Sequence, residues 1–210
     1  MGQAPKKHKD SWHVLVGSAG DSMVIDEALF DIAVLLREKI DPDIESPSVA
    51  LDVWRKEIGD LAFSTYKKYK ERNVENPSFE LLLVAADKHS TILYVTSDGK
   101  TQDLPKFGMI GTGRITGGEL LLSELLKEDI TEEEAAHLAA LVVTVVGHVD
   151  ISVGGKPDIQ MARERCAWVH KETAFEKILK TSESRWELLG KVWWKMQEDK
   201  AIENKLKELL

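Results

Sequence analysis

Two glycine-containing turns hold the residues of this chain whose types and spacing could do chemistry. Gly111-Thr112-Gly113-Arg114 precedes a helical pattern, and the backbone N–H groups at a helix N-terminus attract anions such as phosphate. The motif has neither the Lys-Ser/Thr ending of a nucleotide-binding loop nor the full dinucleotide fingerprint, which argues against a phosphate site. Ala19-Gly20-Asp21-Ser22 is not a nucleophile elbow, because the spacing of its glycines is wrong. The six histidines lack the paired spacing of zinc ligands, so we expect no metal and no cofactor.

The first turn lies between a strand pattern and a helix pattern. Trp12–Val16 is rich in β-forming residues, and Gly17–Gly20 after it predicts a tight turn. Asp21 and Ser22 stand where a helix cap belongs, and apolar residues follow them at helical spacing. A second helix is expected over Ser48–Tyr66, because its apolar residues recur three or four positions apart.

The second turn follows a group of strand patterns. Phe79–Ala86 and Thr91–Thr96 predict a β-hairpin, and Asp98-Gly99 predicts a further tight turn. Phe107–Ile110 predicts another strand, which runs directly into Gly111-Thr112-Gly113.

Helical patterns follow the second turn and occupy the end of the chain. One helix is expected over Thr116–Lys127, and Thr131 begins the next with Glu134 as its capping-box partner. A last strand is expected over Ile159–Ala162, and the chain is helical from Ala174 onward. Strands that are segregated from pairs of helices predict an α+β fold rather than alternating parallel units.

The composition limits the classes of protein to consider. The chain has 210 residues, of which 43% are hydrophobic and 30% are charged, and this balance is typical of a soluble globular protein. It has no run of roughly 18 apolar residues that could span a membrane. The net charge of −8 argues against a nucleic-acid partner. The single cysteine, Cys166, points to a reducing compartment, so we expect a cytoplasmic protein with no membrane partner.

Three segments in register resemble the proteasome β-subunit family of N-terminal-nucleophile (Ntn) hydrolases. They are Val16–Asp21, Ile110–Gly113 and Asp150–Ile159. The resemblance covers roughly residues 5–164 and implies a four-layer αββα sandwich. It assigns residues 1–165 to a proteasome-like domain and residues 166–210 to a C-terminal helical extension.

The resemblance also assigns roles to particular positions. Their ordinary alternatives are a turn for Gly17 and Thr112, a helix end for Asp150, and a solvated flank of the next strand for Lys6. Gly17 matches the glycine whose backbone N–H stabilises the oxyanion of the transition state. Thr112 falls where the family has a serine hydroxyl near the nucleophile's amine, and Asp150 matches the aspartate that orients this hydrogen-bond network. Lys6 resembles the lysine that lowers the pKa near the nucleophile, although Lys7 could be the match instead.

Two departures from the family pattern bear on activity. Val153 stands where the family has a second serine of the network. The first family hairpin, which begins with the nucleophilic threonine, is absent before Lys6. The implied function is a threonine-type peptidase that hydrolyses amide bonds in peptide or protein substrates. We expect this chain to be an N-terminally incomplete version of such a subunit, inactive as written.

The alternative function is a non-catalytic structural or partner-binding subunit of a ring assembly. Members of the family form stacked rings, so the resemblance implies a homo-oligomer. Trp186, Trp193 and Trp194 lie in the C-terminal helical segment and are candidate interface anchors, because tryptophan is enriched where protein interfaces gain most of their energy. Trp186 and Trp193 equally fit packing on the domain's own helices, and Trp194, which lies off their stripe, is the better interface candidate.

Overall fold

The protein divides into two compact units. The computed structural model describes residues 13–38, 46–86, 90–153, 160–163, 166–169, 172–198 and 204. The first unit is formed by Met1–Ile115 with Gln160–Val169, and the second by Thr116–Ile159 with His170–Leu210. The division after residue 165 that the sequence suggests stays a prediction.

The first unit contains a four-stranded antiparallel sheet with the strand order β1-β2-β3-β4. Its strands are β1 (Val14–Gly20), β2 (Phe79–Ala86), β3 (Ser90–Thr96) and β4 (Thr101–Asp103). The helices of this unit are α1 (Ser22–Glu38), α2 (Pro47–Val53) and α3 (Arg55–Glu71). A second, two-stranded antiparallel sheet consists of β5 (Gln160–Arg163) and β6 (Cys166–Val169).

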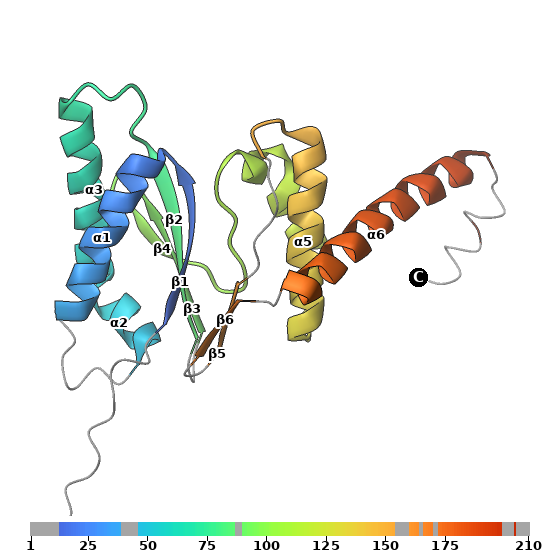
Figure 1. Ribbon diagram of the computed structural model, residues 1–210, viewed down its shortest axis with the longest axis horizontal. Coiled ribbons are helices and arrows are strands. Elements are labelled where there is room, and N and C mark those ends of the chain that lie inside the picture. The colour runs from blue at the N-terminus through green and yellow to red at the C-terminus, as the bar shows by residue number, and fades with distance from the viewer. Residues whose placement is uncertain are drawn as a thin grey trace, which may run out of the picture. The chain divides into compact units, whose positions relative to one another are not determined.

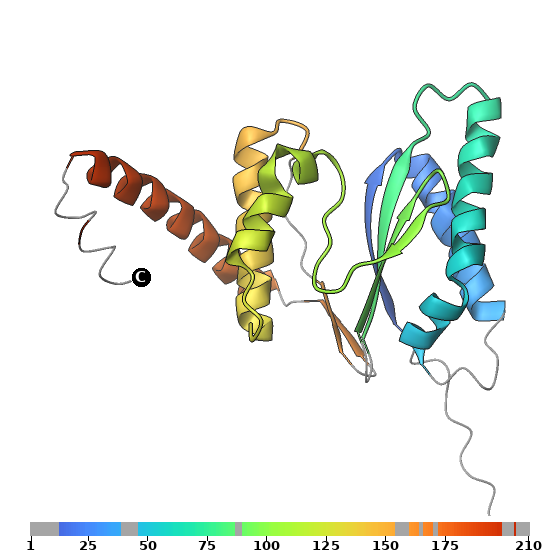
Figure 2. The same ribbon diagram turned by 180° about the vertical axis from the view of Figure 1, so that it is seen from behind.

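The helices and the β5–β6 pair cover opposite faces of the four-stranded sheet. Figures 1 and 2 show α1, α2 and α3 against one face, and β5 beside β1 and β2 on the other. We call the face away from the helices the second face. This arrangement gives the first unit three successive layers of helices, large sheet and small sheet.

The alternating burial of β2 explains why the sheet has one face in the core. Phe79, Leu81, Leu83 and Ala85 are at most 2% exposed and pack with α1 and α3. The residues between them point to the second face and are half-buried, as the two-residue period of a strand requires. β3 follows the same pattern, with Leu93 and Val95 in the core.

Local signals at the helix ends behave as expected. Asp21 Oδ1 accepts hydrogen bonds from the N–H groups of Met23 at 3.0 Å and Val24 at 3.2 Å, so Asp21 caps α1.

The single helix expected over Ser48–Tyr66 is two helices, because Trp54 leaves the helical conformation at φ −96° and ψ 12°. The expected helix beginning at Asp21 and Ser22 and the expected hairpin of β2 and β3 are confirmed.

The second unit is formed by helices. A π-helical turn over Arg114–Gly118, which spans the junction of the two units, leads into α4 (Glu119–Leu125), which packs on α5 (Glu132–Val149). α6 (Glu172–Glu198) also packs on α5, through a small cluster of Ala136, Ala140 and Ile178. Thr131 and Glu134 form the expected capping box at the start of α5.

Two further expected elements in the first unit were wrong. Gly17–Gly20 was expected to be a tight turn, but β1 continues through all four residues and pairs with β2, and the chain turns at Gly20, where φ is 127°. Phe107–Ile110 was expected to be a strand, but it has no strand partner. It lies on the second face of the sheet, where side-chain packing replaces ladder hydrogen bonds.

The fold class is therefore mixed α and β, with antiparallel strands and segregated helices. None of the helices in the described part of the chain is long and apolar enough to cross a membrane.

Candidate functional site

Gly17 lies in the middle of β1, opposite Leu82 of β2. A side chain added at Gly17 would point to the second face, with its Cβ 3.7 Å from Leu82 Cβ and 3.8 Å from Ile110 Cδ1. These are ordinary contact distances, so space alone does not require glycine at this position. β1 is an edge strand of the four-stranded sheet, and Gly17 is exposed.

The chain between β4 and Gly111 crosses the second face and reaches β1. A Cβ at Gly108 would lie 2.9 Å from Leu82 Cδ2, so this glycine allows the segment to pass close over β2. Gly111 has φ 78°, a left-handed conformation that favours glycine, and its Cβ would lie 3.1 Å from Ala19 Cβ. The structure thus brings the two glycine-containing segments singled out in the sequence, one in β1 and one at Gly111, together on one face of the sheet.

A polar network holds the second turn in this place. We call Glu80, Tyr94, Arg114 and the backbone N–H of Gly111 the Glu80 network. Gly111 donates its N–H to Glu80 Oε2 at 2.7 Å, and the Tyr94 hydroxyl donates to Glu80 Oε1. Arg114 Nη2 lies 3.4 Å from Glu80 Oε1, and Arg114 Nη1 donates to the Tyr94 hydroxyl oxygen at 3.3 Å.

The partners in this network stabilise one another electrostatically. The guanidinium carbon of Arg114 lies 5.7 Å from the centroid of the Tyr94 ring, within range of a cation–π interaction. Burial, and then the hydrogen bond to Glu80, raise the pKa of Tyr94 above its ordinary value. Tyr94 therefore stays protonated at neutral pH and acts as a hydrogen-bond donor to the carboxylate.

The same geometry argues against phosphate binding at the second turn. The N–H of Gly111, which an anion at this turn would use, is already bonded to the carboxylate of Glu80. An external anion would have to displace a negative charge of the protein itself, which lies beside Arg114. The geometry therefore agrees with the sequence, which argues against an ordinary phosphate site at this turn.

The other residues predicted for the site lie in different places. Thr112 follows Gly111 directly and is exposed. Asp150 is 9% exposed and ends α5 in the second unit, where its Oδ1 accepts a hydrogen bond of 2.9 Å from the N–H of Ser152. Lys6 and its alternative Lys7 lie outside the described residues. The roles assigned to Gly17, Lys6, Thr112 and Asp150 stay predictions.

Sequence reasoning did not single out Glu80 and Tyr94, and it considered Arg114 only as part of a phosphate site. One signal was available for Glu80. It is the only charged residue in Phe79–Ala86, a strand that is otherwise apolar on both faces. An isolated carboxylate in such a strand needs partners, because burying a charge without them is costly.

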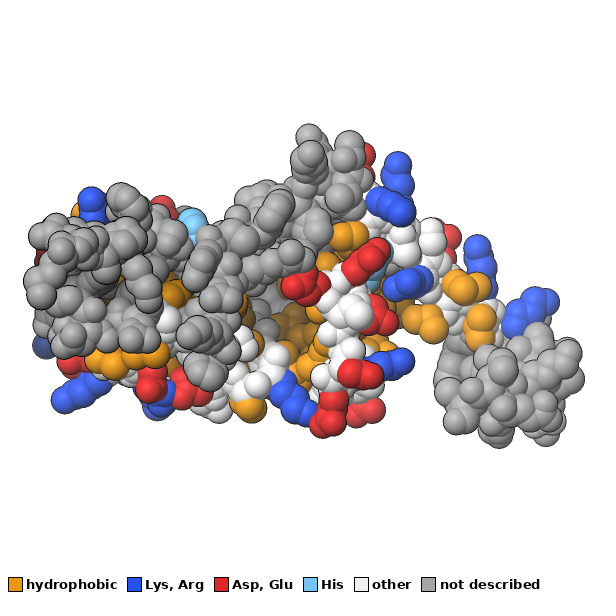
Figure 3. Space-filling model, turned by 90° about the horizontal axis from the view of Figure 1, so that it is seen from below, with side chains coloured by type: hydrophobic (Ala, Val, Ile, Leu, Met, Phe, Trp, Pro, Cys, Tyr) orange, Lys and Arg blue, Asp and Glu red, His pale blue; other side chains and the backbone are white. Residues whose placement is uncertain are grey.

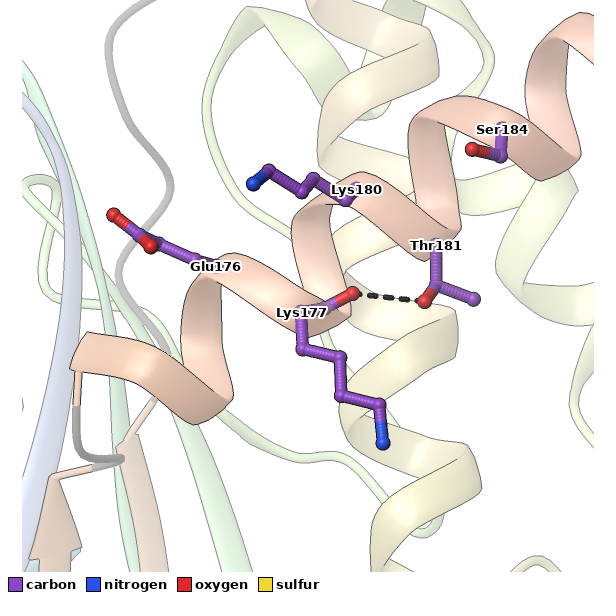
Figure 4. A pocket seen from close by; sticks show the side chains of 5 residues that line it. All are labelled: Glu176, Lys177, Lys180, Thr181 and Ser184. Carbon is purple, nitrogen blue, oxygen red and sulfur yellow. Dashed lines mark hydrogen bonds between the residues drawn. The ribbon is translucent and has the colours of Figure 1, made fainter.

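A shallow hollow on α6 is a weaker candidate. It is lined by Glu176, Lys177, Lys180, Thr181 and Ser184, and all five side chains come from this one helix (Figure 4). The Thr181 hydroxyl donates to the carbonyl oxygen of Lys177 at 2.8 Å, a local bond within the helix. Within the described ranges, no group of three or more His, Cys, Asp or Glu could hold a metal ion.

Comparison with known proteins gives similarity at the level of structure. No protein-family model matches the sequence, and a search of curated proteins finds no match either. The solved structure titled "Anbu (ancestral beta-subunit)" from Yersinia bercovieri is similar, with a TM-score of 0.61, 15% identity, and coverage of 85% of this chain and 79% of that one.

Two structures from Hyphomicrobium sp. strain MC1 are similar to the same extent. A Gly-1 mutant of Anbu has a TM-score of 0.61 and 14% identity, and covers 86% of this chain and 79% of its own. A second Anbu structure from this strain has a TM-score of 0.59 and 15% identity over the same shares of the two chains.

These comparisons correct the family assignment made from the sequence. Assignment to the proteasome β-subunit family of Ntn hydrolases was wrong, because the similar structures are Anbu proteins, a distinct proteasome-like group. At 14–15% identity the likeness covers the fold and not the hydrolase activity. This chain has the proteasome-like fold of an Anbu (ancestral beta-subunit) protein.

Proposed function

We propose that this chain is a structural or partner-binding subunit of a homo-oligomeric, proteasome-like assembly. One observation carries the proposal: the apolar face of α6 continues beyond the part of the helix that α5 covers. The likeness to Anbu subunits supports it, because the fold is shared over most of both chains.

Burial changes abruptly along α6. Ile178 is 6% exposed and Ser182 is fully buried, where they pack on α5. Trp186 lies four residues after Ser182, and Leu189 lies three residues after Trp186, so both are on the same side of the helix. They are 37% and 54% exposed. The second half of α6 thus presents to solvent the side that its first half buries.

Neighbouring exposed residues make this end of α6 a surface patch. We call Trp186 and Leu189 the α6 patch; Leu188 is 58% exposed but lies two positions after Trp186, and therefore faces another side of the helix. Figure 3 shows hydrophobic side chains between lysine and arginine side chains at this end of α6. A clustered apolar surface that contains tryptophan is typical of a protein–protein interface, and a second copy of the chain is the partner that a homo-oligomer requires. The side chains of Trp193 and Trp194 lie outside those described.

The proposal includes the four-layer αββα arrangement expected from the sequence and a location in the cytoplasm. The three layers of the first unit support the arrangement. An experimental structure of the full chain tests the arrangement, and fractionation of the source cells tests the location.

The oligomeric state tests the main proposal. Mass photometry and light scattering over a range of concentrations should show an oligomer for the unaltered chain. Changing Trp186 and Leu189 together to serine should raise the dissociation constant of self-association at least about tenfold. Phe30→Ser is the matched control, because Phe30 is 67% exposed but lies on α1. A monomer at all concentrations would overturn the proposal, and an unchanged oligomer in the double variant would remove the role of the α6 patch.

A second candidate function, hydrolysis of amide bonds in a peptide or protein substrate, is favoured by a different observation. Gly17 and the turn that bears Thr112 approach each other on the second face, through Ile110. In this proposal the Gly17 N–H stabilises an oxyanion, the Thr112 hydroxyl joins the proton network, Asp150 orients that network, and Lys6 lowers a neighbouring pKa.

Fluorogenic peptide amides and an unfolded protein substrate test hydrolysis directly. The protein purified from its native source should cleave them, and Thr112→Ala should lower kcat at least about tenfold. Thr116→Ala is the matched control, a nearby threonine without a proposed role. The hydrolysis proposal fails if the unaltered protein cleaves neither substrate, or if both variants behave alike.

A further inference from the structure

The carboxylate of Glu80 receives donors from three separate places in the first unit. They are the backbone N–H of Gly111 at 2.7 Å, the hydroxyl of Tyr94, and the guanidinium of Arg114 at 3.4 Å. Glu80 is only 25% exposed and Arg114 only 32%. Hydrogen bonds that a carboxylate accepts from such donors are stronger than those between neutral groups.

The position of Glu80 on β2 aims the carboxylate at the turn. Glu80 is opposite Ala19 of β1 and opposite Thr96 of β3, so it points to the second face from an inner strand. Gly111 sits over the same Ala19 at close contact distance. The hydrogen bond from Gly111 to Glu80 therefore fixes two things: the position of the turn along β1, and its height above that strand.

Arg114 completes the attachment from the other end of the turn. Its N–H donates to the carbonyl oxygen of Gly111 at 3.2 Å, and its side chain reaches back to Glu80 and Tyr94. The turn between Gly111 and Arg114 is thus anchored at both ends to one carboxylate. Thr112 lies between the two anchors.

We infer that Glu80 is a positioning residue that fixes the Gly111–Gly113 turn, and with it Thr112, against strand β1. Tyr94 and Arg114 hold the carboxylate in the orientation that Gly111 requires. The inference deepens the hydrolysis proposal and rests on it only for its effect on activity. Its effect on the turn stands independently of any reaction.

Hydrogen exchange of the turn amides tests the inference without any substrate. Glu80→Ala should speed exchange of the Gly111–Arg114 amides about tenfold or more, because it removes the acceptor and its charge. Glu80→Gln retains a carbonyl acceptor and should restore much of the protection. Added formate should slow the exchange in Glu80→Ala, because a small carboxylate can occupy the space between the donors.

Matched variants separate positioning from a general loss of stability. Glu75→Ala removes an exposed carboxylate from the loop before β2 and should leave the turn amides unchanged. If Glu80→Ala does not fold, Tyr94→Phe carries the test, since it removes one donor to the carboxylate and should speed exchange in the turn several-fold. Unchanged exchange in the variants that fold, or no rescue by either glutamine or formate, overturns the inference.

Measurements of kcat and KM distinguish this inference from the proposed hydrolysis. If the unaltered protein cleaves a peptide amide, Glu80→Ala should lower kcat more than it changes KM. The double variant of Glu80→Ala with Thr112→Ala should then have a kcat only slightly below that of Thr112→Ala alone. If the unaltered protein cleaves nothing, the hydrolysis proposal fails, and the exchange result alone decides the role of Glu80.

Discussion

The hydroxyl of Tyr69 on α3 donates a 2.7 Å hydrogen bond to Glu27 Oε2 on α1. Lys68 pairs with the other oxygen of the same carboxylate, and the guanidinium carbon of Arg72 lies 5.7 Å from the centroid of the Tyr69 ring. These contacts tie two helices that pack on the same sheet face. The hydrogen bond from Lys68 and then that from Tyr69 lower the pKa of Glu27 below its ordinary value of 4.5.

This lowered pKa predicts how stability depends on pH. A carboxyl group whose pKa is lower in the folded state stabilises the fold above its unfolded pKa, and the contribution is lost as pH falls. Glu27→Gln should therefore be less stable at pH 7 and should lose less stability than the unaltered chain between pH 6 and pH 3. Urea unfolding at these three pH values measures the difference. Parallel pH curves for the two proteins would contradict the prediction.

A pair of glycines in β1 should respond very differently to alanine. Gly20 has φ 127°, and a Cβ there would lie 2.4 Å from the carbonyl oxygen of Ser78. Gly20→Ala should therefore cost about 2–3 kcal/mol of unfolding free energy. Gly17→Ala meets only ordinary contacts and should change stability by no more than about 1 kcal/mol. Thermal and chemical unfolding of both variants decide the matter, and equal losses would be inconsistent with this geometry.

Two neighbouring leucines test which face of β2 lies in the core. Leu83 is 1% exposed and packs among the helices, so Leu83→Ala should cost about 2–5 kcal/mol. Leu82 points to the second face and is half-buried. Leu82→Ala should cost clearly less, because less apolar surface is returned to water. Denaturant unfolding gives both values, and the reverse order would mean that the strand register is wrong.

The capping box of α5 should contribute measurably to the second unit. The Thr131 hydroxyl oxygen accepts the N–H of Glu134 at 3.3 Å, and Glu134 Oε2 accepts the N–H of Thr131 at 2.9 Å. Thr131→Ala should destabilise the unit by about 1 kcal/mol, whereas Thr131→Ser should retain most of the stability. Circular dichroism during thermal unfolding checks this, and similar melting of the alanine and serine variants would refute the cap's role.

Several features of the candidate site could not be predicted from the sequence because they join distant residues. Glu80 and Gly111 are 31 positions apart, and only the packing of the β4–Gly111 segment across the second face brings them together. That segment contains Phe107–Ile110. Its apolar composition fits two structures equally well: a strand within a sheet, and an irregular segment packed on the face of a sheet. Composition could not distinguish the two, because both bury the same side chains.

The sequence by itself determined the elements whose signals lie within a few residues. The Asp21 cap, the Thr131 capping box, the hairpin of β2 and β3, and the turn at Asp98-Gly99, where Gly99 has φ 83°, all depend on neighbours in the chain. Tertiary structure alone decided that β1 extends through Gly17 to Gly20, since this depends on pairing with β2. It likewise decided that Glu80 holds the second turn, because a carboxylate finds its donors only when strands and turns from distant parts of the chain have packed.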